Sequence, residues 1–154
     1  MGGSYFDRFQ QFGEKNDIDS AINYQLEVVA SALPNSAKRA LHLHNYGLSY
    51  SSHFAHSDHV KDIDSAIKRL FEAVASTPLD STKRPEYLCS LGTSYYIRFL
   101  RFGEVKDIDL AIKHQLEALT STPLDHSAKR TDFLNCLGRT CINRFSGNKI
   151  RTST

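Results

Sequence analysis

The chain repeats itself every 45 residues, and this period limits its fold more than any other feature. The sequence DIDSAI at residues 17–22 returns unchanged at 62–67 and as DIDLAI at 107–112, so the block moves by 45 residues each time. A second block, Gly-x-Ser-Tyr, begins at residues 2, 47 and 92, and a related last copy at 138 is shifted by 46. Self-similarity at a fixed period of this size is typical of stacked repeat proteins, which usually provide binding surfaces.

Each repeat contains two segments with the spacing of an amphipathic helix. Leu88, Gly92, Tyr95 and Phe99 follow one another at intervals of four, three and four residues, which places them on one face of a helix. The second segment carries apolar residues at similar spacing and ends near a proline. The pattern predicts an all-α chain with helices at residues 3–12, 17–32, 38–56, 62–76, 83–102, 107–121 and 128–145.

Polar residues and glycines mark the predicted helix ends. A carboxylate can accept hydrogen bonds from the free amides at a helix start, so one aspartate in each repeat is predicted to be an N-cap: Asp17, Asp62 and Asp107. Gly13 and Gly103 are predicted to end first helices in the left-handed conformation, with Asp58 in this position in the middle repeat.

The composition favours a protein of the cytoplasm without a membrane segment. No apolar run approaches the ~18 residues that span a bilayer, and residues 1–11 lack the apolar core of a secretory signal. The three cysteines, Cys89, Cys136 and Cys141, are odd in number and show no C-x-x-C spacing, which indicates reduced thiols. A net charge of +2 falls short of the strongly basic character of nucleic-acid binders, so nucleic acid is a disfavoured partner.

The two-helix unit resembles the tetratricopeptide repeat. That pattern contains L-G-x-x-Y in its first helix, matched by Leu91, Gly92 and Tyr95, and two small residues followed by proline in its second. The second-helix matches are Ala66, Ala73 and Pro78 in one repeat and Ala111, Ala118 and Pro123 in the next. Leucine stands where the family usually has tryptophan, and the period is 45 rather than ~34. This 45-residue variant of the pattern is similar to the long arrays that precede CHAT domains in fungal proteins and to kinesin-light-chain-like repeats.

The resemblance implies a right-handed α-solenoid of antiparallel helix pairs, about three and a half repeats long. It covers residues 2–145: a partial repeat at 2–35, full repeats at 36–80 and 81–125, and a last first-type helix at 126–145. Residues 146–154 are predicted to form a frayed polar tail. Because every repeat has the same stacking problem, residues that recur in all repeats are predicted to pack the joints: Gly47, Gly92, Gly138, Tyr50, Tyr95, Phe54, Phe99, Phe145, Ala66 and Ala111.

Positions that vary on the first helices are free to serve a ligand. In tetratricopeptide arrays these helices line the concave surface, so the resemblance implies a groove for a peptide or a partner helix. Its candidate residues are His44, Asn45, Leu48, Ser51, Ser52, Cys89, Ser90, Thr93, Tyr96, Ile97, Asn135, Arg139, Ile142 and Asn143. We therefore expect a non-enzymatic scaffold that binds a protein or peptide, with self-association through uncapped ends as a further possibility.

The sequence offers weaker signals for three other kinds of chemistry. Recurring basic pairs such as Lys38-Arg39 could track a phosphate backbone, although recurring acidic residues favour ion pairing instead. A hydrolase would use Cys89 or Cys136, but no nucleophile motif surrounds either thiol. Zinc needs about four convergent ligands, and of the five histidines at 42–59 only His56 and His59 have useful spacing. We expect no catalytic residue, metal or cofactor.

Overall fold

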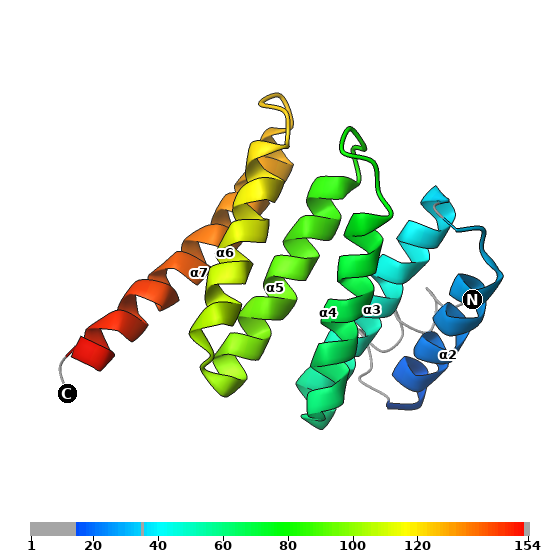
Figure 1. Cartoon of the computed structure of the whole chain (residues 1–154), viewed down its shortest axis with the longest axis horizontal. Coiled ribbons are helices and arrows are strands. Elements are labelled where there is room, and N and C mark those ends of the chain that lie inside the picture. Colours follow the sequence, from blue (N-terminus) through cyan, green and yellow to red (C-terminus); the bar gives the residue numbers. More distant parts are fainter. Residues whose placement is uncertain (1–14, 35, 153–154) are drawn as a thin grey trace. The chain divides into compact units, whose positions relative to one another are not determined.

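The computed structural model describes residues 15–34 and 36–152, and within these ranges the chain forms six helices and no strand (Figure 1). This confirms the all-α class. The helix predicted at 3–12 and the cap predicted at Gly13 lie outside the described residues. The chain divides into two compact units, residues 1–81 and 82–154, and each is described by itself. The solenoid arrangement stays a prediction.

Each unit contains three described helices that pack in the order of the chain. The first unit holds α2 (Lys15–Ser31), α3 (Ala37–Ser57) and α4 (Val60–Ala75), with α3 packed against both α2 and α4. The second holds α5 (Arg84–Phe102), α6 (Val105–Thr120) and α7 (Ser127–Thr152), with α6 packed against both α5 and α7. Only two residues separate α3 from α4 and α5 from α6, so each of these pairs is an antiparallel hairpin.

Left-handed residues end α3 and α5, as predicted. Asp58 has φ 57° and Gly103 has φ 75°, and their amides donate to the carbonyl oxygens of Phe54 at 2.8 Å and Phe99 at 2.7 Å. These bonds satisfy carbonyls that the end of a helix otherwise leaves without an intrahelical partner. The resulting sharp reversal brings the second helix of each hairpin back along the first.

The recurring glycines of α3 and α5 mark a close approach between two helices, as predicted. A Cβ atom at Gly47 would lie 2.5 Å from Leu70 Cγ and 3.1 Å from the Ala66 carbonyl oxygen. At Gly92 it would lie 2.8 Å from Gln115 Cγ and 3.0 Å from the Ala111 carbonyl oxygen. Any larger residue at either position would push the two helices apart, which offsets the weaker helix propensity of glycine. Both facing alanines are fully buried.

The same prediction is wrong for the third glycine. A Cβ atom at Gly138 would meet nothing within 4 Å, because no described helix packs on that side of α7. The recurring phenylalanine, seven residues after each glycine, shows the same difference: Phe54 is 5% exposed and Phe145 is 72% exposed. Of the other predicted joint residues, Tyr50, Tyr95 and Phe99 are half-buried. Tyr50 lies against Tyr46, with ring centroids 5.0 Å apart.

The predicted aspartate N-caps are also wrong. α4 and α6 begin at Val60 and Val105, so Asp62 and Asp107 lie in the first turn, and neither true cap position makes a side-chain capping bond. Both carboxylates instead reach back to the first helix of the hairpin. His53 Nδ1 lies 2.6 Å from Asp62 Oδ2, and the Arg98 guanidinium donates to Asp107 at 2.9 and 2.6 Å. Asp17 is not an N-cap either, because it lies inside α2, two residues after the helix begins.

The last helix continues through the segment predicted to be a frayed tail. α7 extends to Thr152 rather than ending at Phe145. Residues 146–152 contain no proline and a single glycine, so nothing in their covalent structure ends a helix that is already formed. The last two residues of the predicted tail lie outside the described part of the chain.

Gln115 offers a direct test of packing at the glycine joint. Its side chain is 1% exposed and its Oε1 atom has no hydrogen-bond partner, whereas the equivalent position in α4 is Leu70. Replacing Gln115 by leucine is expected to raise the free energy of unfolding by about 1–2 kcal/mol, because a buried acceptor without a partner is removed. Urea denaturation of both chains measures the difference. An unchanged or lower midpoint would show that Oε1 is satisfied in solution.

Candidate functional site

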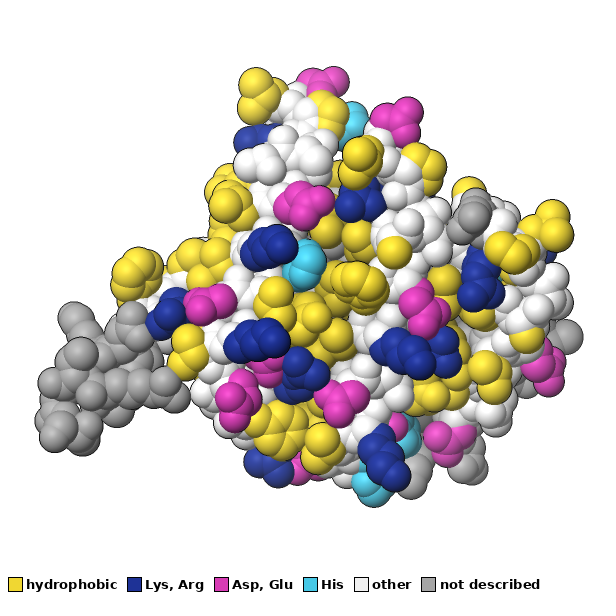
Figure 2. All heavy atoms as spheres, in the orientation of Figure 1, with side chains coloured by type: hydrophobic (Ala, Val, Ile, Leu, Met, Phe, Trp, Pro, Cys, Tyr) yellow, Lys and Arg dark blue, Asp and Glu magenta, His cyan; other side chains and the backbone are white. Residues whose placement is uncertain are grey.

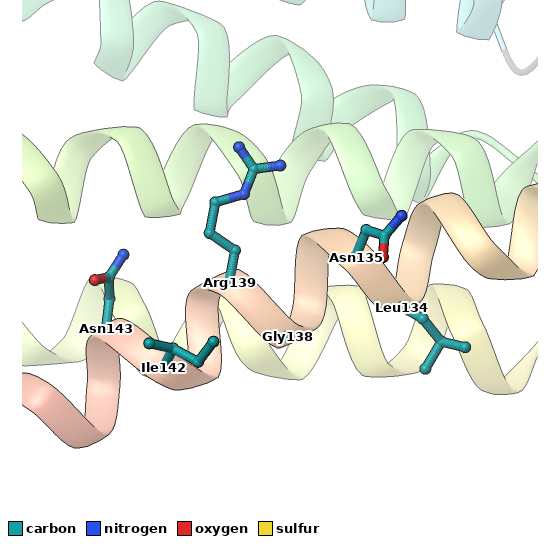
Figure 3. A pocket seen from close by; sticks show the side chains of 6 residues that line it. All are labelled: Leu134, Asn135, Gly138, Arg139, Ile142 and Asn143. Atoms are coloured by element: carbon teal, nitrogen blue, oxygen red, sulfur yellow. The ribbon is translucent and has the colours of Figure 1, made fainter.

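A surface hollow of about 410 Å³ lies along α7. Its lining residues are Leu134, Asn135, Gly138, Arg139, Ile142 and Asn143, four of which are predicted groove residues. They form two rows at a spacing of four residues, as expected on one face of a helix. Figure 3 shows Asn135, Arg139 and Asn143 extending from one side of α7 as a polar row, beside Leu134, Gly138 and Ile142. The site thus presents amide and guanidinium donors next to apolar surface.

The apolar row is open to solvent. Leu134 is 51% exposed and Ile142 is 66% exposed, and Gly138 between them leaves a flat stretch of backbone. Leu134 and Ile142 lie two helical turns apart on one face of α7, so their side chains give this face an apolar character.

The polar row meets α5 at one end. Asn143 Nδ2 donates a hydrogen bond to the Tyr96 hydroxyl, which joins two predicted groove residues from neighbouring first helices. Tyr96 is buried at 9% exposure, so its side chain braces α7 against α5 and is not open to a ligand. That corrects its assignment to the groove surface. The remaining groove residues of α5 are half-buried: Cys89, Ser90, Thr93 and Ile97.

The groove residues predicted on α3 belong to the other unit. His44 is 4% exposed, so the prediction that it lines an open groove is wrong. Its neighbours on the same face, Asn45, Leu48, Ser51 and Ser52, are half-buried. Variation between repeats at position 44 is therefore not by itself a sign of an exposed groove residue.

Cys89 does not have the character of a catalytic nucleophile. Burial, together with the neighbouring Cys136 thiol, raises the pKa of Cys89 to about 12. The thiol therefore stays protonated at neutral pH, whereas nucleophilic attack requires the thiolate. This argues against the hydrolase alternative at Cys89.

The histidines of α3 make structural contacts. His53 bonds to Asp62 and lies 3.6 Å from Asp19 through its other ring nitrogen, and His42 Nδ1 lies 2.9 Å from Gln25 Oε1. His56 bonds to a carbonyl oxygen of its own helix. Among the residues with described placement, no three His, Cys, Asp or Glu side chains come together in a way that could hold a metal ion.

The recurring arginines bind protein groups instead of forming an open ladder. Arg39 donates to the Val29 carbonyl oxygen at 2.7 Å, and Arg130 donates to the Leu119 and Thr122 carbonyl oxygens at 3.0 and 2.6 Å. Each guanidinium thus caps the end of the preceding helix, where the dipole favours a cation. On the face shown in Figure 2, basic and acidic side chains are intermixed. Both observations weigh against a phosphate-binding stripe.

One signal in the sequence could have revealed the cross-hairpin ion pairs. A basic residue stands nine positions before the first aspartate of each DID block, as Arg8, His53 and Arg98 do before Asp17, Asp62 and Asp107. Nine residues span one tight reversal between helices, which brings the two side chains to the same level of a hairpin. An aspartate near a helix start by itself predicts an N-cap, and only the basic residue nine positions earlier distinguishes the ion pair from a cap.

His114 makes the stability of the second unit depend on pH. Burial lowers the pKa of His114 below its ordinary value of 6.5, with nearby Lys113 and Arg84 acting in the same direction and Glu117 against it. The unfolded chain then binds a proton that the folded chain resists, so stability is lost as the pH falls below about 6.5. We expect the Tm of the His114→Phe variant to fall less than the Tm of the parent chain between pH 7.5 and 5.5. Phenylalanine keeps a ring beside Tyr95, where the His114 ring centroid lies 5.8 Å from that of Tyr95. Equal losses would contradict this.

Comparison with protein-family models, with curated proteins and with solved structures finds no match to this chain. None of the helices in the described part of the chain is long and apolar enough to cross a bilayer.

Proposed function

We propose that this chain is a non-enzymatic protein-interaction module of tetratricopeptide-like helix pairs, which binds a segment of a partner protein on the exposed face of α7. The hollow along α7 is the observation that carries the proposal. Its apolar row supplies burial, and the Asn135 and Arg139 side chains supply donors at its edge. An interface with an apolar centre and a polar rim is the arrangement that protein partners use.

The 45-residue period supports the same proposal, because hairpins of this kind bury their apolar faces by stacking and present varied residues outward. The resemblance to tetratricopeptide arrays adds a solenoid, a scaffold role and a cytoplasmic location to the proposal. A nucleic-acid partner is a weaker candidate, since the recurring arginines at 39 and 130 are bonded to carbonyl oxygens.

A displayed library of random 16-residue peptides, panned on the full chain, tests the proposal. We expect enriched peptides whose affinity falls at least about tenfold when Ile142 is replaced by aspartate, because a charge in the apolar row must be desolvated. Leu124→Asp is the matched control, since Leu124 is 83% exposed and lies outside the hollow. Failure to enrich any peptide, or equal binding by the two variants, would refute an interaction site on α7.

A further inference from the structure

Three helices of the chain carry one and the same face. A leucine, a glycine, a basic residue and a phenylalanine follow at intervals of four, six and one residues. The three sets are Leu43, Gly47, His53 and Phe54 in α3; Leu88, Gly92, Arg98 and Phe99 in α5; and Leu134, Gly138, Arg144 and Phe145 in α7. The equal spacing gives each helix the same surface for a neighbour.

This face is covered in the first two helices and exposed in the third. Leu43 is fully buried and Leu88 is 1% exposed, whereas Leu134 is 51% exposed. α4 lies against Gly47 and α6 lies against Gly92, but nothing lies within 4 Å of a Cβ atom at Gly138. The face of α7 therefore carries the same leucine, glycine, basic residue and phenylalanine as a surface that binds a helix twice within this chain.

The helices that cover α3 and α5 share a pattern of three residues at intervals of four. In α4 these are Asp62, Ala66 and Leu70, and in α6 they are Asp107, Ala111 and Gln115. The aspartate bonds to the basic residue of the first helix, and the alanine brings its carbonyl oxygen to 3.1 or 3.0 Å from the glycine site. The third side chain lies over the glycine, with Leu70 Cγ 2.5 Å and Gln115 Cγ 2.8 Å from a Cβ atom there.

We infer that α7 docks an antiparallel helix of a partner protein that carries Asp-x-x-x-Ala-x-x-x-Leu or the same pattern ending in Gln. This inference rests on the proposed function and names its partner. The small alanine is required because a larger side chain would hold the two backbones apart at Gly138. Leu134 and Phe145 supply the apolar contacts at either side of the glycine.

Arg144 supplies the charge that this pattern requires. Its Nε atom donates to Asp109 of the preceding helix at 2.7 Å. In the first unit, His53 contacts Asp19 of the preceding helix at 3.6 Å and Asp62 of the following helix at 2.6 Å. One basic residue thus joins the helices on both sides, and a guanidinium has enough donors to bind two carboxylates. The aspartate of the docked helix takes the place that Asp62 has beside His53.

The observed burial argues against a second copy of this chain as the occupant. The three described helices that carry the pattern already bury it. Ala21, Ala66 and Ala111 are fully buried, and the third residues, Gln25, Leu70 and Gln115, are at most 2% exposed. A second copy could present one of these helices only by opening its own packed core. The free energy of that opening exceeds the free energy gained by burying one exposed helix face.

A labelled 16-residue peptide with the sequence of α4, VKDIDSAIKRLFEAVA, is the probe for the intact chain in fluorescence anisotropy. We expect saturable binding with a Kd on the order of 100 µM, because a short peptide loses conformational entropy when it becomes helical. Changing the alanine of the DIDSAI segment to leucine, or its first aspartate to lysine, is expected to weaken binding at least about tenfold.

Gly138→Leu in the chain is the decisive variant, because a Cβ atom there has no neighbour within 4 Å and the added side chain fills the docking surface. We expect it to remove peptide binding while the helical circular dichroism is retained and the Tm is unchanged or higher. Leu124→Ala, in an exposed connection, is the matched control and should bind like the parent. Binding that survives Gly138→Leu would overturn the inference, since the peptide would then be exchanging with α4 elsewhere.

Two further outcomes separate the explanations. Self-association of the chain alone that Gly138→Leu abolishes, seen by sedimentation, would make a second copy the occupant and overturn the inference. Failure of the α4 peptide while library peptides still bind in a manner that depends on Ile142 would refute the docked helix and leave the proposed function standing. If neither the α4 peptide nor any library peptide binds, both the docked helix and the proposed function are refuted.

Discussion

Replacing Gly92 by leucine is expected to lower the free energy of unfolding of the second unit by about 2–3 kcal/mol, whereas the same change at Gly138 raises it by up to about 1 kcal/mol. A Cβ atom at Gly92 would lie 3.0 Å from the Ala111 carbonyl oxygen, and backbone cannot rotate away as a side chain can. At Gly138 no atom lies within 4 Å, so only the better helix propensity of leucine remains.

The two variants are matched because both glycines lie inside a helix at equivalent repeat positions and receive the same side chain. Urea denaturation followed by circular dichroism measures both on one scale. Destabilisation of similar size at the two sites would show that a helix covers Gly138 in solution. Little effect at Gly92 would show that α5 and α6 do not meet at backbone distance.

Replacing Asp107 by asparagine is expected to cost about 2–4 kcal/mol of stability, because the Arg98 guanidinium loses its carboxylate in a mostly buried position. The Asp107 side chain is 6% exposed and that of Arg98 is 27% exposed, which keeps the expected cost below that of a fully buried pair. Replacing both partners together, by Arg98→Met and Asp107→Leu, is expected to recover most of the loss, since no unpaired charge remains.

Asp109→Asn is the matched control for this pair. Its bond to Arg144 is 2.7 Å long, close to the 2.6 Å of the Arg98–Asp107 pair, but the Asp109 side chain is 55% exposed. Solvent screens an exposed pair, so we expect a cost under about 1 kcal/mol. Equal losses from the two single variants would mean that Asp107 is hydrated in solution and that the pair does not hold the hairpin.

The local signals in the sequence proved reliable wherever they depend on the chain close by. The apolar spacing of four and three residues around Gly92 predicts a helix, and α5 forms over Arg84–Phe102. Gly103 and Asp58 adopt the left-handed conformation because a sharp end after a helix requires it, whatever packs nearby. The predicted end of the last helix at residue 145 is wrong, because a polar composition does not by itself stop a helix and α7 extends to Thr152.

The candidate site was predicted only in part. The variation between repeats predicts Asn135, Arg139, Ile142 and Asn143 as groove residues, and they line the hollow together with Leu134 and with Gly138, which the pattern predicts to pack a joint. His44 and Tyr96 vary in the same way, yet they are buried. Variation between repeats shows that a residue is not needed for stacking, but it does not show whether a neighbouring helix covers that residue.

The sequence by itself determined the helical class, the antiparallel hairpins and the joint at Gly47 and Gly92, because periodicity, turn chemistry and the size of a side chain act over a few residues or recur with the period. The tertiary structure decided what Asp62, Asp107, Gly138 and Phe145 do. Gly92 and Gly138 share the same spacing to a leucine, an arginine and a phenylalanine, yet they lie in opposite environments, since one helix has a neighbour on that face and the other has none among the described residues. Whether a residue is buried depends on the helix that packs against it as well as on the residue itself, and the sequence of a repeat specifies only the residue.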